Sequence, residues 1–361
     1  MRKKKICLMY NHFQSQDGVN RSAIAIANEL VKRNDVEVTL IPLFKFDKEC
    51  FNYLDGAVKV KRIFGFYFKG FTRLVNIIPT KWLYRLTINN KYDVNIAFQY
   101  GHSYRIIAAG INYNHESIGW MHGYDEGLSY KEYYQKMDKL VCVSKCNAER
   151  LAAEIGCSVA VDYNYNPIDE DGVCKQGEEQ IDIERSKDLL FVTVGRMSPE
   201  KGFERLLNSV KRLKADGYKF SLWLIGDGPL LESLKEQSAN LKINDIVTFL
   251  GRKVNPHAYT SKSDVFVCSS FAEGYSTVCT EAIMLNIPVI STNVSGAAEI
   301  IEEAGCGAVF ESTEDAIYYN MKYILDNPHL VEEWKKILMN TKGNFSRERR
   351  FNRFLNIVGL K

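Results

Sequence analysis

Short apolar runs alternate with segments of helical spacing along almost the whole chain. This alternation is typical of parallel sheets covered by helices on both faces, because parallel strands need long crossover connections that are usually helical. The pattern is interrupted after Asn166-Pro167 by a polar, acidic stretch with few large apolar residues. We therefore predict an α/β protein with two Rossmann-like, doubly wound domains joined by a linker.

The domain limits follow from where these patterns start and stop. We predict a first domain over residues 1–168, a linker over 169–188, a second domain over 189–335, and a C-terminal helix over 336–361 that could return to the first domain. The strands expected in the first domain are residues 5–10, 36–42, 93–98, 117–122 and 139–144, and its clearest helix is 21–32. The strands expected in the second are residues 189–194, 221–225, 246–250, 264–268 and 288–291. Open α/β sheets bind ligands outside the carboxyl ends of their strands, so we expect these edges to face a central cleft.

Composition narrows the class of protein. The chain has 361 residues, more than one core comfortably holds, and 46% of them are hydrophobic. A formal net charge of only +3, with opposite charges interspersed, argues against a nucleic-acid-binding protein. Nine scattered cysteines without a Cys-x-x-Cys cluster indicate reduced thiols of a cytoplasmic protein. The first apolar run is too short for a secretory leader, and no run is long enough to span a membrane.

The second domain opens with a loop that suits a diphosphate. In Gly195-Arg-Met-Ser-Pro-Glu-Lys201-Gly202, Arg196 and Lys201 lie between a strand and a helix, where backbone N–H groups already favour an anion. Arginine offers a planar fork of donors and lysine a compact charge, so together they can neutralise a leaving group without a metal. The alternative is an ordinary charged strand-to-helix loop.

Two carboxylates lie eight positions apart in Glu273-Gly-Tyr-Ser-Thr-Val-Cys-Thr-Glu281. Glu273 follows a predicted strand, and Glu281 lies about one turn inside the next helix at ~3.6 residues per turn. At the carboxyl end of a parallel sheet, both can accept hydrogen bonds from the vicinal hydroxyls of a sugar or ribose. The alternative is a surface turn followed by a solvated helix.

Two more turns of the second domain contain glycine. Gly226-Asp-Gly-Pro229 lacks the third glycine of a dinucleotide fingerprint, so we interpret it as a tight turn rather than a catalytic loop. Ser295-Gly-Ala-Ala-Glu299 opens another predicted helix and could lend backbone donors to the same site.

In this order, the four motifs of the second domain resemble those of the retaining glycosyltransferases of family 4, which have the GT-B fold and a Glu-x7-Glu motif. The likeness covers essentially the whole second domain. In the first domain it is weaker and rests on Gly18 before a helix, on Val141-Cys-Val-Ser144 and on Asn166-Pro167. The resemblance implies that the first domain binds the acceptor and the second binds a nucleotide-sugar.

The resemblance also implies roles for individual residues. Arg196 and Lys201 would hold the diphosphate and stabilise its developing charge, Glu273 would bind the donor sugar, and Glu281 would bind the ribose. The other donor-binding positions would be Gly18, Gly226, Gly274, Tyr275, Ser276 and Thr277. The family uses the nucleotide-sugar as co-substrate and no bound metal, and no Asp-x-Asp site follows a strand here.

A histidine ends the predicted strand in Ile118-Gly-Trp-Met-His122-Gly123, where family members often carry an active-site histidine or acid. With a pKa near its unperturbed value of ~6.5, the imidazole of His122 could exchange protons or donate a hydrogen bond. The alternative is a structural histidine. His12, His102 and His115 are weaker candidates.

The stretch from Lys59 to Arg85 has basic residues and no acidic one, and aromatic residues interleave them. Its cations are Lys59, Lys61, Arg62, Lys69, Arg73, Lys81 and Arg85. Such a stretch could lie on an anionic membrane, or it could form helices with a solvated basic face over an aromatic core. Single-stranded nucleic acid is a less favoured partner.

The sequence therefore predicts a retaining hexosyl- or N-acetylhexosaminyl-type glycosyltransferase of surface polysaccharide biosynthesis. We expect a UDP-sugar as donor before a GDP-sugar, a glycan acceptor that is favoured to be lipid-linked, and a cytoplasmic protein that could associate with the inner face of the membrane. A sugar-nucleotide epimerase, a transferase with a soluble acceptor and a non-catalytic, membrane-associated partner in glycan assembly are the alternatives.

Overall fold

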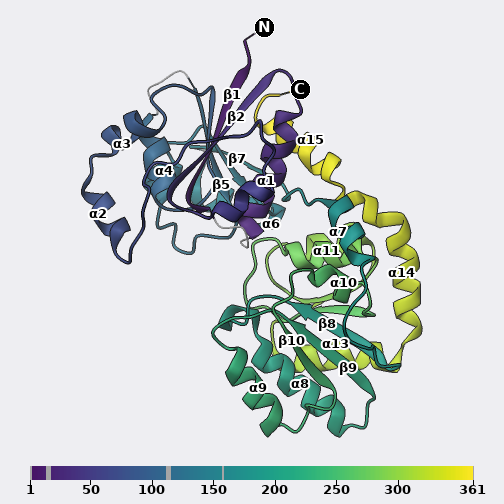
Figure 1. The fold of residues 1–361 in the computed structure, drawn as a ribbon. Coiled ribbons are helices and arrows are strands. Elements are labelled where there is room, and N and C mark those ends of the chain that lie inside the picture. The colour runs from purple at the N-terminus through teal and green to yellow at the C-terminus, as the bar shows by residue number, and fades with distance from the viewer. Residues whose placement is uncertain (1, 14–17, 111–114, 157, 361) are drawn as a thin grey trace. The chain divides into compact units, whose positions relative to one another are not determined.

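The computed structural model describes residues 2–13, 18–110, 115–156 and 158–360 (Figure 1). The chain forms two compact units. Unit 1 contains Met1–Ile168 and Arg350–Lys361, and unit 2 contains Asp169–Arg349. Each unit has its own parallel sheet, which confirms the prediction of two Rossmann-like domains.

Unit 1 is built on a seven-stranded parallel sheet in the order β3-β2-β1-β4-β5-β6-β7. Its strands are β1 (Lys4–Phe13), β2 (Val36–Phe46), β3 (Lys59–Val60), β4 (Val94–Ala97), β5 (Glu116–Met121), β6 (Lys139–Cys142) and β7 (Ala160–Tyr163). The two strands of this sheet that sequence patterns missed, β3 and β7, lie at its edges. β3 has only two residues and β7 has no fully buried residue, so neither shows an apolar run.

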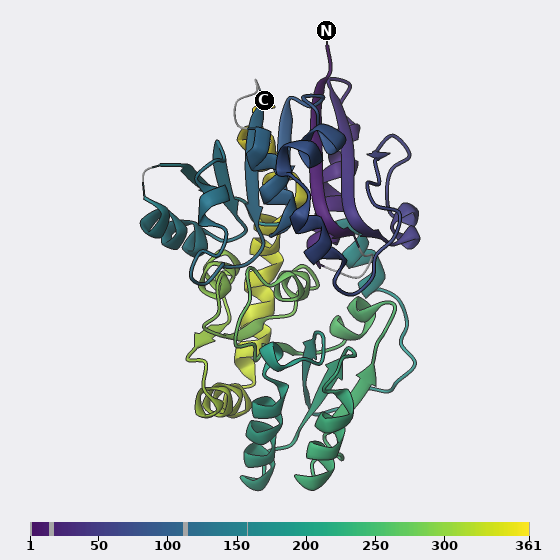
Figure 2. The same ribbon diagram turned by 90° about the vertical axis from the view of Figure 1, so that its left-hand side faces the viewer.

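Helices cover both faces of this sheet, with α4 on one face and α1 and α15 on the other (Figures 1 and 2). The helices of unit 1 are α1 (Gly18–Val31), η1 (Lys48–Asn52), α2 (Phe71–Ile77), α3 (Thr80–Thr87), α4 (His102–Ile107), η2 (Ala108–Gly110), α5 (Lys131–Tyr134), α6 (Lys145–Ile155) and α15 (Arg347–Ile357), whose first residues belong to unit 2. The ring of Phe354 in α15 packs against Trp120 of β5 at a centroid distance of 5.4 Å.

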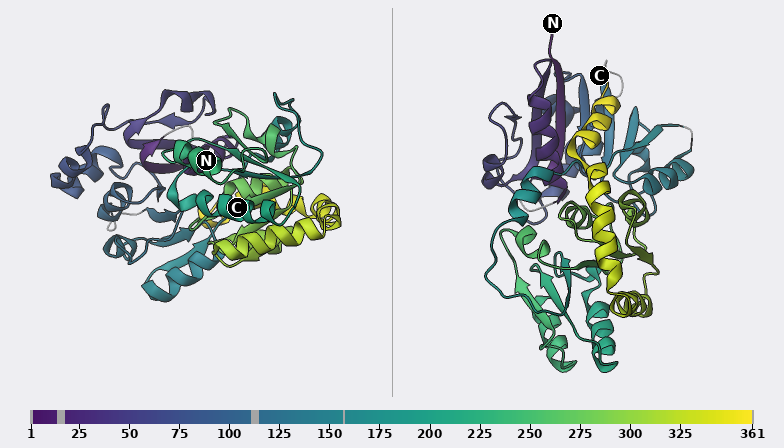
Figure 3. Two further views of the ribbon diagram at one scale, coloured as in Figure 1. Left: turned by 90° about the horizontal axis from the view of Figure 1, so that it is seen from below. Right: turned by 90° about the vertical axis from the view of Figure 1, so that its right-hand side faces the viewer.

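The C-terminal segment differs from the single helix expected over residues 336–361. It consists of α14 (His329–Thr341), η4 (Lys342–Phe345) and then α15, which Figure 3 shows as successive helices. The chain passes back into unit 1 at Arg350, whose Nη1 donates to the carbonyl of Asn166 at 3.0 Å. Three residues later, Nε of Arg353 donates to the carbonyl of Tyr163 at 2.6 Å. These hydrogen bonds fix α15 to β7 and to the residues that follow it.

The segment expected to be a linker, residues 169–188, belongs to unit 2 and begins with a helix, α7 (Glu170–Gly177). Val173 is the large apolar residue that α7 buries, so its composition resembles that of a loop. The carbonyl of Gly177 accepts a 2.6 Å hydrogen bond from Ser261, and a Cβ at Gly177 would lie 2.4 Å from Leu285. Close packing therefore anchors this polar segment to unit 2.

Unit 2 has a six-stranded parallel sheet in the order β10-β9-β8-β11-β12-β13. Its strands are β8 (Leu189–Val194), β9 (Phe220–Ile225), β10 (Val247–Gly251), β11 (Val265–Cys268), β12 (Val289–Thr292) and β13 (Ala308–Phe310). Because β8 and β11 are neighbours, the loops that follow them meet at the same edge of the sheet. The motifs with Lys201 and Glu273 lie on these two loops.

The helices of unit 2 surround this sheet. Besides α7, α14 and η4 they are η3 (Pro199–Lys201), α8 (Phe203–Ala215), α9 (Leu231–Asn240), α10 (Pro256–Thr260), α11 (Thr277–Met284), α12 (Ala297–Ala304) and α13 (Glu314–Asp326). None of the helices in the described part of the chain is both long and apolar enough to cross a membrane.

The turn after β9 requires glycine because it touches the turn after β8. Gly226 has φ +145°, and a Cβ on it would lie 1.9 Å from the carbonyl oxygen of Gly195. Backbone hydrogen bonds also join the two turns, from Met197 N to the carbonyl of Asp227 and from Leu230 N to the carbonyl of Met197, both at 2.9 Å. The tight turn predicted from sequence thus supports the loop that carries Arg196 and Lys201.

Replacing Gly226 by alanine should force these turns apart. We expect Gly226→Ala to lower the free energy of unfolding by about 3 kcal/mol, since it combines backbone strain with a steric clash. Gly251→Ala is the matched control, because Gly251 also has positive φ, +65°, but a Cβ there meets nothing within 4 Å. It should cost about 1 kcal/mol. Urea unfolding curves that fall together for the two variants would contradict the assigned contact.

Candidate functional site

The loops after β8 and β11 are joined by backbone and side-chain hydrogen bonds. The backbone N–H of Phe271 donates to the carbonyl of Glu200 at 2.7 Å, and the Ser269 hydroxyl donates to the carbonyl of Lys201 at 2.9 Å. Gly202, with φ +64°, permits this approach, because a Cβ there would lie 2.3 Å from the carbonyl oxygen of Ser269. The two sequence motifs thus form one structural site.

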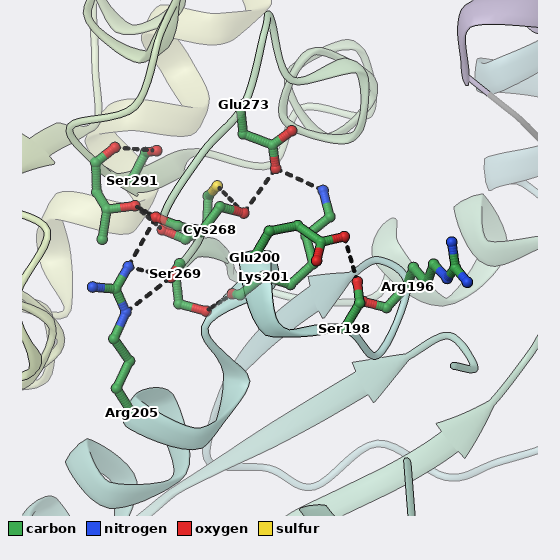
Figure 4. A network of polar contacts seen from close by, with 11 residues as sticks. Arg196, Ser198, Glu200, Lys201, Arg205, Cys268, Ser269, Glu273 and Ser291 are labelled. Carbon is green, nitrogen blue, oxygen red and sulfur yellow. Dashed lines mark hydrogen bonds and ion pairs between the residues drawn. The ribbon is translucent and has the colours of Figure 1, made fainter. Parts of the chain in front are cut away.

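Lys201 and Glu273 face one another across this junction (Figure 4). Nζ of Lys201 lies 2.7 Å from Oε1 of Glu273, which also accepts a 2.7 Å hydrogen bond from the Ser270 hydroxyl. Their side chains are 20% and 14% exposed, so the ion pair is largely shielded from water. Burial alone would lower the pKa of Lys201, but the Glu273 carboxylate outweighs it and raises the pKa above its usual value. Lys201 is therefore positively charged at neutral pH.

Arg196 is on the same loop but makes a different kind of contribution. It is exposed, and Figure 4 shows its side chain extending away from the Lys201–Glu273 pair. Its guanidinium makes no hydrogen bond or ion pair with the described residues. The site therefore combines a cation held by a carboxylate with a second cation that a ligand can engage without breaking an existing pair.

Arg205, which the sequence analysis did not single out, holds the loop before Glu273. It is 7% exposed and its guanidinium donates to the carbonyls of Ser269 and Ser270, at 2.5 Å and 2.8 Å from Nη2. It also donates from Nη1 to the carbonyl of Ser312 at 2.6 Å, and it stacks over the ring of Phe271 at 3.7 Å. Within an amphipathic helix it resembles any surface arginine, so its burial is the signal that identifies it.

Glu281 lies on α11, the helix that the Glu273 loop enters. Its side chain is 5% exposed, and Oε2 is 3.3 Å from Nε2 of His257, a residue that the sequence analysis also missed. Gly274, Tyr275, Ser276 and Thr277 occupy the turn between the two glutamates and the first position of α11. The Ser295-Gly296 turn packs on this segment, since a Cβ on Gly296 would lie 2.8 Å from the Tyr275 ring. Four of the motifs predicted from sequence are thus gathered in unit 2.

The remaining predicted site residues, Gly18 and His122, lie in unit 1. Gly18 is the first residue of α1. His122 follows β5, and its ring packs on Phe98 at a centroid distance of 4.6 Å. Both ring nitrogens of His122 are inaccessible to solvent and have no hydrogen-bond partner within the described ranges.

The expectation that His122 titrates near neutral pH is wrong. Burial lowers its pKa from 6.5 to about 3, because an imidazolium without a buried partner is poorly stabilised. His122 is therefore neutral at pH 7, where it can donate or accept a hydrogen bond but does not exchange protons as a group near half-protonation would.

The pH dependence of stability tests this assignment. Because the pKa of His122 is lower in the folded than in the unfolded chain, its contribution is complete above pH ~6.5 and is lost as the pH falls. Between pH 7 and pH 5 the loss should be about 2 kcal/mol. His122→Phe should remove that component from urea unfolding curves measured at both pH values, whereas His329→Asn, at an exposed site, should leave it. An unchanged pH slope in His122→Phe would contradict the buried neutral imidazole.

Comparison with known proteins agrees with this architecture. Residues 176–339 match the family model described as Glycosyl transferases group 1. The chain is 29% identical over 205 residues to N-acetylgalactosamine-N,N'-diacetylbacillosaminyl-diphospho-undecaprenol 4-alpha-N-acetylgalactosaminyltransferase of Campylobacter jejuni, and the match spans about half of each protein, 56% and 54%. It is 25% identical to the lipopolysaccharide core biosynthesis glycosyltransferase LpsD of Rhizobium meliloti, over 90% of both chains.

Solved structures show the same fold at low sequence identity. Anabaena HepE, in a complex with UDP and glucose, superposes with a TM-score of 0.78 at 14% identity and 99% coverage of both chains. WaaG, a glycosyltransferase involved in lipopolysaccharide biosynthesis, superposes with a TM-score of 0.75 at 13% identity, over 98% of this chain and 99% of its own. The chain therefore has the GT-B fold, and its residues 176–339 match the group 1 glycosyl transferases.

Proposed function

We propose that the chain is a retaining glycosyltransferase of the family 4 type, which transfers a sugar from a UDP-sugar to a lipid-linked glycan in surface polysaccharide biosynthesis. The observation that carries the proposal is the junction of the β8 and β11 loops, where Lys201 pairs with Glu273 and Arg196 remains exposed. Such a junction offers cations to a diphosphate and a carboxylate to sugar hydroxyls on adjacent loops.

The names of similar proteins support the substrate classes. The Campylobacter jejuni relative is named for an acceptor linked to diphospho-undecaprenol and for transfer of N-acetylgalactosamine. An Escherichia coli relative, 28% identical over 222 residues, is named an O-antigen biosynthesis glycosyltransferase. HepE was solved with UDP, which favours a uridine nucleotide, and a GDP-sugar is the second choice.

In the proposed reaction, the bond between the anomeric carbon and the diphosphate oxygen breaks while the acceptor hydroxyl attacks from the same face. Negative charge grows on the departing diphosphate, so Lys201 and Arg196 stabilise the transition state more than the bound donor. The acceptor proton leaves with the diphosphate, and no bound metal takes part. Glu273 binds donor hydroxyls, a role consistent with an oxygen already held by Lys201 and Ser270.

Two substitutions separate donor binding from chemistry. Arg196→Ala should lower kcat about 10²- to 10³-fold, because it removes a cation from the developing charge. Glu281→Ala should instead weaken nucleotide binding about tenfold or more, because a carboxylate no longer accepts ribose hydroxyls. Lys211→Ala, at an exposed position of α8, is the matched control and should change neither.

The assay is transfer and release of nucleotide from a panel of UDP- and GDP-sugars, with isothermal titration of UDP and GDP, in the presence of EDTA. Wild-type activity in both Arg196→Ala and Glu281→Ala would contradict the assignment of these residues to the donor site. Donor binding without transfer would favour a non-catalytic partner, and interconversion of the donor sugar would favour an epimerase. Loss of activity with EDTA would contradict the metal-free reaction.

The proposed lipid-linked acceptor gives the surface around α2 and α3 a partner, an anionic bilayer. Large apolar side chains are exposed there between 43% and 79%: Phe66, Tyr67, Phe68, Leu74, Ile77, Trp82 and Leu86. Exposed cations lie among them: Lys69, Arg73, Lys81 and Arg85. These residues, the α2–α3 surface, all lie in one segment at the edge of unit 1 (Figure 1). Rings and aliphatic groups can enter the lipid interface while the cations meet acidic headgroups.

The structure also separates this surface from the rest of the basic stretch. Phe71 and Tyr84 are buried in the core of unit 1, so some aromatic residues of the basic stretch pack in the core while others are exposed. Lys59 pairs with Glu37 at 2.9 Å. Lys61 donates to the carbonyls that end α3, including that of Thr87 at 2.7 Å. Lys59 and Lys61 are therefore structural cations, and membrane binding is assigned to the exposed residues from Phe66 to Leu86.

Liposome sedimentation tests this partner. We expect the wild type to sediment with vesicles that contain an acidic phospholipid, and Lys81→Glu/Arg85→Glu to reduce the bound fraction several-fold, since each cation contributes ~1 kcal/mol near an anionic surface. Ile77→Ser/Trp82→Ser should do the same by removing apolar contact. The control, Lys211→Glu/Lys336→Glu, makes the same charge change at exposed sites in unit 2 and should bind like the wild type. Equal sedimentation of all variants would remove the proposal.

A further inference from the structure

His257 has both ring nitrogens close to groups from other helices. It is 5% exposed on α10, and its Nε2 lies 3.3 Å from Oε2 of Glu281 on α11. This is an ion-pair distance without the alignment of a full hydrogen bond. The other nitrogen, Nδ1, lies 2.7 Å from Oε1 of Gln176 on α7. A histidine thus links the carboxylate assigned to the ribose with a helix that is far away in the sequence.

We propose that His257 is a positioning residue, which fixes the Glu281 carboxylate for the ribose hydroxyls of the bound nucleotide. The inference rests on the proposed function, because it deepens the role given there to Glu281. His257 itself is not assigned any contact with the nucleotide.

The orientation of the Gln176 amide decides the role of Nδ1. If the side chain presents its oxygen, Nδ1 donates to it. If the amide is turned so that its N–H₂ faces Nδ1, then Nδ1 accepts and the neutral ring carries its hydrogen on Nε2. That hydrogen then lies on the nitrogen 3.3 Å from Oε2 of Glu281, an electrostatic contact outside hydrogen-bond alignment.

The ring is held in place by more than this pair. Nδ2 of Asn255 donates to the backbone carbonyl of Gln176 at 2.8 Å, while Oδ1 of Asn255 caps α10 by accepting from Ala258 N at 3.2 Å. α10 and α7 are therefore joined at Asn255 as well as at His257. A carboxylate that is 5% exposed needs fixed donors to hold one orientation, because turning it toward apolar surroundings is costly.

A purely structural role for His257 makes a different prediction. If the ring only filled space, its loss would alter folding stability or weaken all nucleotides alike. If it positions Glu281, its loss should weaken only the part of nucleotide affinity that comes from ribose hydroxyls. UDP and 2′,3′-dideoxy-UDP separate the two, since they differ only in those hydroxyls.

Isothermal titration of both ligands, or of GDP and its dideoxy analogue if GDP is the nucleotide that binds, provides the test. We expect the wild type to prefer the ribose form about ten- to hundredfold. In His257→Phe, most of this preference for the ribose form over the dideoxy form should be lost, while the affinity for the dideoxy form should stay the same. His257→Gln, whose amide can still donate a hydrogen bond, should retain part of the ribose preference. The control is Tyr259→Phe, because Tyr259 is on the same helix but donates to Asp182; this variant should retain the whole preference.

Gln176→Ala provides the test if His257→Phe does not fold. Gln176 is exposed, so its substitution removes the contact at Nδ1 of His257 without leaving a cavity in the core. It should lower the ribose preference partially. An unchanged preference in the folded His257 and Gln176 variants would overturn the inference while the proposed function stands. A wild type that binds neither nucleotide would instead overturn the nucleotide assignment, and the role of His257 with it.

Discussion

The functional architecture of unit 2 depends on how the loop after β8 is joined to the loop after β11. Backbone and side-chain hydrogen bonds connect Glu200 and Lys201 with Ser269 and Phe271, and the Lys201–Glu273 pair closes the junction. Parallel order brings the two loops to one edge, and glycine allows their backbones to touch. A charge on one loop is thereby placed beside a carboxylate on the other.

Burial then gives the charged groups of the protein different properties. Lys201 stays positively charged because a carboxylate compensates for its loss of water, whereas His122, which has no such partner among the described residues, becomes a neutral ring. The guanidinium of Arg196 remains exposed to solvent and can bind a ligand. The degree of desolvation thus explains why Lys201 is a cation paired with a carboxylate, Arg196 a solvated cation and His122 an uncharged imidazole.

Sequence patterns predicted the elements whose signals are local. The central strands of both sheets are buried on both faces, so runs such as Leu189–Val194 were found with the bounds that the structure gives. Short edge strands and the polar helix α7 were missed because they bury too few apolar residues to leave a pattern. The position of Lys201 and Glu273 on strand-to-helix turns was also predictable, whereas their pairing requires the strand order β9-β8-β11, which no local segment encodes.

Residues that act through distant contacts could not be found in the same way. Arg205 has the helical spacing of a surface cation, and His257 is 81 positions from the Gln176 side chain that it contacts. Their roles are visible only through burial and hydrogen bonding. The titration of His122 was misjudged for the same reason, since the sequence shows a histidine after a strand but not the loss of water around its ring.

A crystal structure of the wild-type protein with UDP tests the central claim most directly. The account predicts the diphosphate at the junction of the β8 and β11 loops, with its oxygens within hydrogen-bond distance of Lys201 Nζ and the Arg196 guanidinium, and the ribose at Glu281. A nucleotide bound at full occupancy elsewhere, with the Lys201–Glu273 pair solvated and untouched, would contradict it.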